Sequence, residues 1–162
     1  MSDSGAIMGI VTSWRDVVAA DPHFADHVRR TFAVRKHAIL ATLRRDGSPR
    51  ISGTEVDFAD TGEIYLGMMP GSVKALDLRR DPRLALHCPT EDTPESDPAT
   101  WLGDGKIAGA AVEVSDSHRV DAAHRFRIDI TEVVLTTVGS GGDHLLIQSW
   151  HRERGMVRRE RA

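Results

Sequence analysis

The clearest candidates for chemistry are a serine and a lysine that follow a proline-glycine turn. Pro70 and Gly71 end an apolar segment, and Ser72 and Lys74 open a segment with helical spacing. A helix N-terminus presents unpaired backbone N–H groups and the positive end of the helix dipole. Ser72 adds a hydroxyl at the N-cap position, and Lys74 adds a positive charge within the first turn. These donors suit an anion, most simply a phosphate, although a solvated lysine on a surface helix would give the same pattern.

Arg50 and Ser52 are a second candidate pair. They are two residues apart in a segment with strand character, so their side chains share one face of the expected strand. An arginine on a half-exposed antiparallel strand is equally compatible with a position that faces solvent.

The elements that must position these residues are short strands joined by tight turns. A strand at 37–43 is followed by an Asp46-Gly47 hairpin signal, a returning strand at 49–58 and a third strand at 63–68. The helix that starts at Ser72 ends before Pro82, because proline disfavours helical geometry in the residue before it. Further strands are expected at 84–88, 103–115, 126–138, 143–151 and 155–161.

Three further helices complete the expected secondary structure: one capped by Ser13, one that begins at Asp21-Pro22, and a short one over 116–125. No strand–helix–strand repeat runs through the chain, which excludes a parallel sheet of alternating strands and helices. The pattern predicts a mainly β (α+β) fold, a closed barrel of about seven or eight antiparallel strands with short flanking helices. A length of 162 residues predicts one domain at 13–162, after a loose tail at 1–12.

Three segments together resemble one known family. They are GSVKA at 71–75, RDPR at 80–83 and the hairpin LATLRRDGSP at 40–49. In this order and spacing they resemble the pyridoxamine 5′-phosphate oxidase-like FMN-binding split β-barrels. The resemblance implies a split barrel that works as a homodimer, with cofactor clefts between the subunits.

The resemblance also implies a set of cofactor-binding residues. In this family the serine-lysine turn binds a flavin phosphate, an arginine of the second strand lines the cofactor, and backbone atoms before the turn face the flavin ring. Carried onto this chain, the implied cofactor-binding residues are Arg50, Ser52, Gly67, Met68, Met69, Ser72 and Lys74. No catalytic residue is assigned, because no serine–histidine–aspartate or cysteine–histidine arrangement can be identified.

Two departures from the family bear on the choice of cofactor. Val73 and Glu55 stand where pyridoxamine phosphate oxidases carry basic residues. A site with fewer cations favours the deazaflavin F420, whose negative charges lie on a long tail, over FMN. We therefore expect F420-dependent hydride transfer to an organic substrate. Two alternatives remain open: an FMN-dependent oxidase or reductase, and a non-enzymatic heme or tetrapyrrole carrier with a histidine ligand.

Composition excludes several other functions. The net charge of −3 gives no electrostatic basis for binding nucleic acid or an anionic membrane. Cys88 is the only cysteine, so no intrachain disulfide can form, and it is expected to be a small core residue rather than a reactive thiol. His23 and His27 share a helix face but lack a third metal ligand, so no metal site is predicted. No transmembrane segment or signal peptide is recognised, and we expect a cytoplasmic protein.

Overall fold

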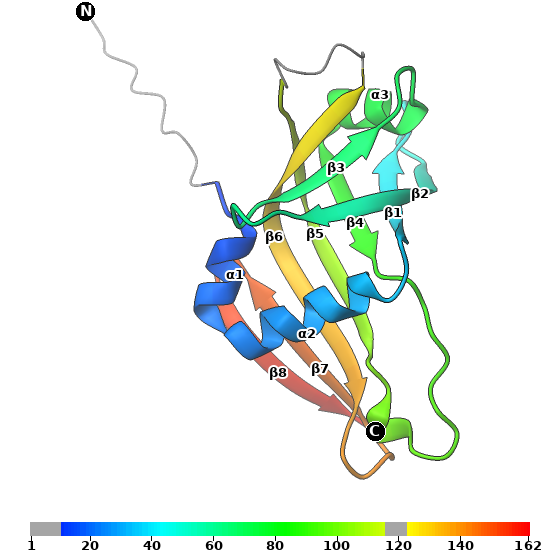
Figure 1. Ribbon diagram of the computed structural model, residues 1–162, viewed down its shortest axis with the longest axis vertical. Helices are drawn as coiled ribbons and strands as arrows, with labels where there is room; N and C mark the ends of the chain where they lie inside the picture. Colours follow the sequence, from blue (N-terminus) through cyan, green and yellow to red (C-terminus); the bar gives the residue numbers. More distant parts are fainter. Residues whose placement is uncertain (1–10, 116–122) are drawn as a thin grey trace, which may run out of the picture.

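The computed structural model describes residues 11–115 and 123–162 (Figure 1). Six antiparallel strands close into a barrel, and two more strands extend the sheet beyond it. The strands are β1 (His37–Leu43), β2 (Pro49–Phe58), β3 (Ile64–Met68), β4 (Arg83–His87), β5 (Asp104–Glu113), β6 (His124–Val138), β7 (Leu145–His151) and β8 (Gly155–Arg161). The helices are α1 (Trp14–Ala20), α2 (Pro22–Ala33), α3 (Val73–Arg80) and the short 3-10 turn η1 (Pro98–Thr100).

The strand order is β3-β2-β1-β4-β5-β6-β7-β8, and a pairing between β3 and β6 closes the barrel. β6 can serve both parts of the sheet because it has 15 residues. Its first residues pair with β3, and its last residues pair with β7. The hairpin turns on either side of β2 contain Gly47 and Gly62, whose positive φ angles of 83° and 82° suit glycine.

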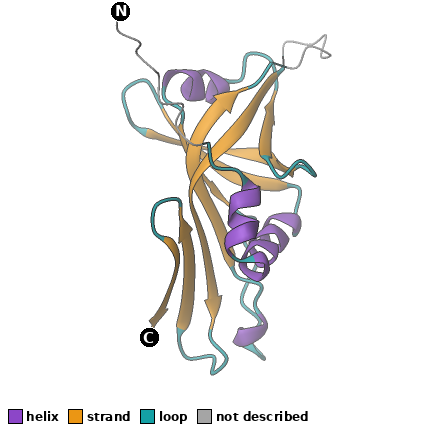
Figure 2. Cartoon of the chain, turned by 90° about the vertical axis from the view of Figure 1, so that its left-hand side faces the viewer, coloured by secondary structure: helices purple, strands orange, loops and turns teal. Residues whose placement is uncertain are grey.

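The core is built from the inward-facing residues of the strands and from one face of the helices. Ile64, Leu66 and Met68 alternate along β3 and are all buried. α2 adds Phe24 and Phe32 from one face, and it packs against β5 and β6 (Figure 2). Full burial of each such side chain contributes about 1.5–3 kcal/mol to the free energy of folding. This inner core stabilises the barrel although its outer face is exposed.

The predicted fold class is confirmed, and the three helices expected at Ser13, Pro22 and Ser72 are present. The expected helix at 116–125 differs. Residues 116–122 lie outside the described part of the chain, and His124 and Arg125 belong to β6. Arg125 pairs with Gly67 of β3, so ladder hydrogen bonds extend the strand beyond the clear apolar alternation.

The predicted tail is only partly described, because residues 1–10 lie outside the described ranges. Thr12 is not loose. It is 4% exposed, its N–H donates to Asp129 Oδ1 at 2.8 Å, and its carbonyl accepts from the N–H of Ile130. None of the helices in the described residues has the length and apolar character needed to cross a bilayer.

Candidate functional site

The predicted anion-binding turn lies at one end of the barrel, where α3 follows β3 (Figure 1). Gly71 has a φ of 74°, which turns the chain from β3 into the helix. Ser72 occupies the N-cap position as expected, but its hydroxyl makes no capping hydrogen bond. The N–H of Ala75 already donates to the carbonyl oxygen of Ser72 at 3.1 Å, so the N–H groups of the first turn that remain for a ligand are those of Val73 and Lys74. The Ser72 hydroxyl and these N–H groups can therefore act together toward a ligand.

Lys74 extends from the first turn of α3 toward β2. Its Nζ donates to the carbonyl oxygen of Gly53 at 2.6 Å. Burial lowers the pKa of this lysine, because a charged ammonium loses solvation where it is partly covered. The contact fixes the ammonium at the outer face of β2, and the remaining N–H groups of Nζ can reach an anion there.

Two glycines make a side-chain-free floor on the outer face beside Lys74. Gly53 of β2 and Gly67 of β3 are both exposed, and neither has a heavy atom of another residue within 4 Å of where a Cβ would lie. We call this surface the glycine floor. A flat aromatic ring can approach backbone closely at such a place, because no side chain intervenes.

Charged residues of both signs border the glycine floor. Arg125 of β6 pairs with Gly67, so its side chain lies on the same face. Its guanidinium carbon lies 3.9 Å from the ring centroid of Tyr65, and it also approaches Asp57. The β2–β3 register places Glu55 beside Gly67, and Glu55 pairs with Lys36 at 3.1 Å. Arg125 is a site candidate that the sequence did not reveal, because the predicted helix over 116–125 hid its place in β6.

The structure places Arg50 under α3 rather than on the glycine floor. Its Nε donates to Asp77 Oδ2 at 2.7 Å. Asp77 is 2% exposed and also accepts from Thr42 and Arg80. Burial alone would raise the pKa of Asp77, but the hydrogen bonds from Arg80, Arg50 and Thr42 outweigh this effect and hold the pKa below its usual value. Arg50 therefore already has a carboxylate partner, which reduces what it can offer to a phosphate.

The remaining predicted residues are divided between the two faces of the sheet. Ser52 lies on the same side of β2 as Arg50, and its Oγ is buried without a hydrogen-bond partner among the described residues. The Met68 side chain belongs to the core, whereas Met69 is 79% exposed next to the turn. Lys74, Gly67 and Met69 therefore border one surface, while Arg50 and Ser52 face the barrel interior.

Arginine residues surround a second hollow, on the other side of α3. Its volume is about 540 Å³, and its lining comes from the β1–β2 turn, from β2 and from α3. The lining residues are Arg45, Arg50, Val73, Leu76, Asp77, Arg79 and Arg80. Arg79 forms two hydrogen bonds with Glu113 at 2.8 and 2.7 Å, and Arg80 donates to Asp77. Internal carboxylates thus already neutralise much of the positive charge of this hollow.

An apolar groove continues from the glycine floor along the outer face of the barrel. Its volume is about 360 Å³, and it crosses β2, β1, β4, β5 and β6. Ile51 is 74% exposed and Ile39 is 44% exposed, and Ala85 and Ala108 lie between them and β6. Ile51 lies two residues before Gly53 on the same face of β2, so the apolar groove and the floor are continuous.

No protein-family model and no curated protein sequence matches this chain. Solved structures do match its fold. A pyridoxamine 5′-phosphate oxidase-related, FMN-binding protein from Nostoc punctiforme is 11% identical, with a TM-score of 0.63 over 88% of this chain and 96% of that one. PhzG from Burkholderia lata, solved with tetrahydrophenazine-1-carboxylic acid, is 13% identical, with a TM-score of 0.61 over 92% of each chain. A heme-binding protein from Mycobacterium smegmatis is 13% identical, with a TM-score of 0.51 over 84% of this chain and 86% of that one.

The chain therefore shares its fold, a split β-barrel, with these proteins. At these identities the likeness establishes the fold alone, and the neighbours include both FMN-binding and heme-binding proteins. What this split barrel binds therefore has to be argued from its own residues.

Proposed function

We propose that this split barrel is an oxidoreductase that binds a phosphate-bearing flavin or deazaflavin on the glycine floor. The observation that carries the proposal is the combination of Gly53 and Gly67, which leave backbone accessible, with the ammonium of Lys74 fixed at one edge. The ring would lie against the floor, and its phosphate would lie at the N-terminus of α3. Hydride transfer is chemistry that such a cofactor supplies, while the protein binds and orients it.

The residues present fit this group. Ser72 and Lys74 offer a hydroxyl and an ammonium to the phosphate, and Arg125 adds a second cation at the floor. Met69, which is exposed beside the turn, can cover one side of the ring. Contact between the ring and the exposed Met69 side chain displaces water, which adds a favourable contribution that does not depend on charge.

The balance of charge around the floor favours F420 over FMN. Lys74 and Arg125 are cations beside the floor. Lys36 is a third, but it already pairs with Glu55, and Asp57 lies beside Arg125. A terminal phosphate monoester carries about −1.5 to −2 charges at neutral pH, so it needs more cations than this floor supplies. F420 places most of its negative charge on a long tail that can reach beyond the barrel. We therefore propose F420-dependent hydride transfer to an organic substrate.

Titration of the purified protein with each cofactor at matched salt tests this choice. F420 is expected to bind at least ~10-fold more tightly than FMN, a difference of ~1.4 kcal/mol. Replacing Val73 with Arg and Glu55 with Lys should shift the preference toward FMN, because both changes add positive charge near the phosphate. If the unmodified protein binds FMN more tightly, the charge argument fails and an FMN-dependent oxidoreductase replaces the F420 assignment.

The same titration distinguishes a heme carrier from both redox cofactors. His87 lines the apolar groove and would be the residue that holds the iron of a heme bound there. Heme bound in this way gives an intense Soret band that is lost in His87→Ala. Tight heme binding with no affinity for either flavin-type cofactor would overturn the oxidoreductase proposal.

We further propose that the protein is a homodimer whose partner copy covers the apolar groove. The isoleucines at positions 39 and 51 expose apolar surface to water. Burial of this surface by a second copy would lower the free energy of the dimer. Because the groove adjoins the glycine floor, the partner would form one wall of the cofactor cleft.

A further inference from the structure

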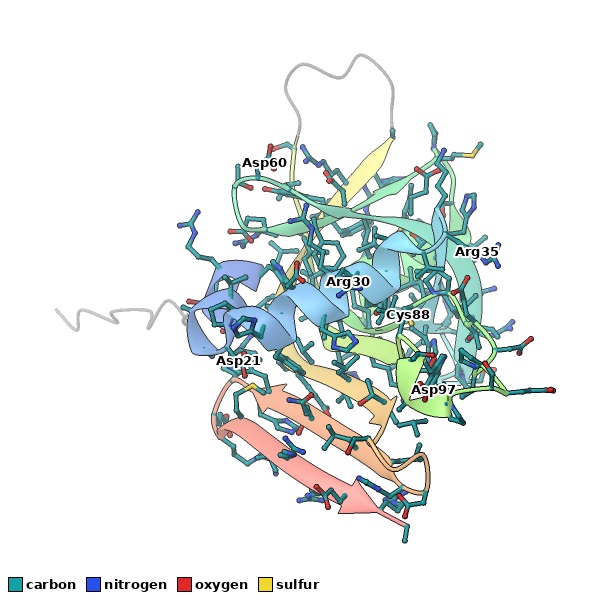
Figure 3. All side chains as sticks on the ribbon, turned by 60° about the horizontal axis from the view of Figure 1, so that its bottom comes forward. Asp21, Arg30, Arg35, Asp60, Cys88 and Asp97 are labelled. Carbon is teal, nitrogen blue, oxygen red and sulfur yellow. The ribbon has the colours of Figure 1, made fainter. Side chains whose placement is uncertain are left out.

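Three residues that can ligate a metal converge at the end of β4 and the start of β5, where His87 lines the apolar groove. His87 is the last residue of β4, Cys88 follows it, and Asp104 is the first residue of β5. One ligand atom from each residue lies within 4.8 Å of the other two. Cys88 lies beside α2, near the loop that carries Asp97 (Figure 3). We propose that His87, Cys88 and Asp104 bind a divalent metal ion with the ligand preferences of zinc.

The ligand types form one of the sets that zinc accepts. Zinc binds cysteine sulfur at about 2.3 Å, and it binds histidine nitrogen and carboxylate oxygen at roughly 2.0–2.2 Å. Ligand atoms around a tetrahedral ion are thus about 3.5 Å apart. His87 Nε2 is 3.8 Å from Asp104 Oδ2, which is close to this spacing. Three protein ligands leave the fourth position for water or another molecule, on the side where His87 is 34% exposed.

The histidine is already held in the orientation that metal ligation needs. His87 Nδ1 lies 2.7 Å from the carbonyl oxygen of Cys88. A proton on Nδ1 that is donated to this carbonyl leaves the lone pair on Nε2, the nitrogen that faces Asp104. Histidines that ligate metals commonly donate their other ring N–H in this way.

An unpaired carboxylate oxygen is the second observation that points to a cation. Asp104 Oδ1 is buried and has no hydrogen-bond partner among the described residues. A buried, unpaired carboxylate oxygen is costly unless a cation or a donor reaches it. Oδ2, the other oxygen of Asp104, faces His87, so a metal that also satisfies Oδ1 would bind the carboxylate through both of its oxygens.

The surroundings of the sulfur are compatible with a metal-bound thiolate. Burial holds the pKa of the Cys88 thiol above its usual value, although the N–H of Gly105, which donates to Sγ at 3.2 Å, acts in the opposite direction. Metal binding would therefore release the thiol proton. A thiolate, a carboxylate and a neutral imidazole give a total charge of −2, which one dication neutralises. The charge that burial would otherwise penalise is thereby removed.

Such a metal would tie together the two ends of the loop that joins β4 to β5. The N–H of Cys88 already donates to the carbonyl of Gly105 at 2.9 Å, so the ion would reinforce an existing closure. His27 of α2 also contacts the loop, with Nε2 2.7 Å from the carbonyl oxygen of Leu102. The proposal does not depend on the flavin or deazaflavin, because none of the three ligands borders the glycine floor. His87 also lines the apolar groove and is the residue that the heme alternative would use, so only that alternative shares a residue with the metal site.

The test uses Co²⁺ and Zn²⁺ alone on the full-length protein after removal of metals with a chelator. We expect one Co²⁺ per chain, with a thiolate-to-cobalt charge-transfer band that Zn²⁺ abolishes by displacement. Cys88→Ser should remove the band, and Asp104→Asn and His87→Gln should weaken binding roughly tenfold or more. Zn²⁺ should raise the melting temperature of the wild-type protein but not that of Cys88→Ser.

The chain offers a matched control in His144 and Asp143, a surface histidine–carboxylate pair with 2.8 Å between its atoms. His144→Gln and Asp143→Asn should leave Co²⁺ binding unchanged. Co²⁺ that binds without a charge-transfer band, or that binds equally well to Cys88→Ser, would overturn the proposal. Failure of this test leaves the cofactor proposal untouched, because flavin and deazaflavin titrations use neither Cys88 nor Asp104.

Discussion

At the scale of single residues, the buried carboxylate of Asp77 connects α3 to the barrel. Three groups from three elements donate to it: Thr42 of β1, Arg50 of β2 and Arg80 of α3 itself. No sequence pattern indicates this role, because Asp77 resembles an ordinary polar residue of an exposed helix. Arg50 was predicted as a phosphate ligand. Its ion pair with Asp77 gives it a structural role, because it helps to hold α3 against the strands.

Asp77→Asn should destabilise the protein at neutral pH. We expect a loss of about 1.5–3 kcal/mol in the free energy of unfolding, the range for hydrogen bonds to a charged group. The pKa of Asp77 is lowered in the folded state, so its contribution is present above the unfolded pKa of about 3.9 and is lost as pH falls through the folded pKa. Urea unfolding at pH 7 and near pH 3 should therefore show a difference between wild type and variant that shrinks in acid.

Asp143→Asn is the control, since its carboxylate is 80% exposed and, within the described ranges, pairs with His144 at the surface. It should change stability little at either pH. A difference between wild type and Asp77→Asn that stays constant from pH 7 to pH 3 would contradict the assigned role.

Lys74 acts at the same scale but toward the cofactor. Lys74→Ala should weaken binding of the preferred cofactor by ~1.5–3 kcal/mol, because one charged donor to the phosphate is lost. Fluorescence titration measures this. Arg158→Ala, which removes a positive charge from β8 where Arg158 approaches Glu160, should leave affinity unchanged. Equal affinities for wild type and Lys74→Ala would exclude Lys74 from the phosphate site.

At the scale of elements, β2, β3 and β6 position the floor through their register. Gly67 lies opposite Arg125 in the β3–β6 pairing that closes the barrel. The same pairing therefore shapes the fold and brings a cation to the candidate site. A side chain introduced at Gly67 would point into open space on the outer face. It should therefore affect the candidate site without disturbing the pairing that closes the barrel.

Gly67→Val should fold normally and fail to bind cofactor. No heavy atom lies within 4 Å of the Cβ position, and valine suits a strand better than glycine by up to ~1 kcal/mol. The isopropyl group would occupy the space that the ring needs. Melting temperature and cofactor titration on the same sample check both parts, with Gly67→Ala expected to be intermediate. Full affinity in Gly67→Val would place the cofactor elsewhere.

The sequence predicted the elements well because local signals agree with the fold here. β1, β2 and β8 begin and end where alternation and turn residues place them, and the Asp46-Gly47 turn forms as expected. The start of β6 could not be predicted, since the polar residues His124 and Arg125 are held there by pairing with β3, a contact distant in sequence. The same contrast between local signals and distant contacts explains why only part of the site was predicted. Lys74 is positioned by its own helix, whereas the partner of Arg50 depends on how α3 docks onto the barrel.

At the scale of the whole molecule, the barrel has an apolar outer face that one chain leaves uncovered. Helices α1 and α2 cover one side of the long strands, and α3 covers one end (Figure 1). The apolar groove at Ile39 and Ile51 lies on the opposite surface of the sheet from the core. A specific interface between two proteins typically buries about 800 Å² on each partner, and the groove with the adjoining floor provides a continuous surface on which to build one.

Ile51→Glu should convert the proposed dimer into a folded monomer. Ile51 is 74% exposed in one chain, so a glutamate there costs the isolated barrel little, but it would place a charge inside an apolar interface. Sedimentation at micromolar concentration should give about twice 17.8 kDa for the wild type and the single-chain mass for the variant. Val18→Glu on α1, which changes an exposed apolar residue away from the groove, should remain dimeric.

The monomeric variant should also bind cofactor more weakly, because the cleft loses the wall that the partner provides. A wild-type protein that sediments as a monomer and still binds its cofactor would show instead that one chain supplies the whole site.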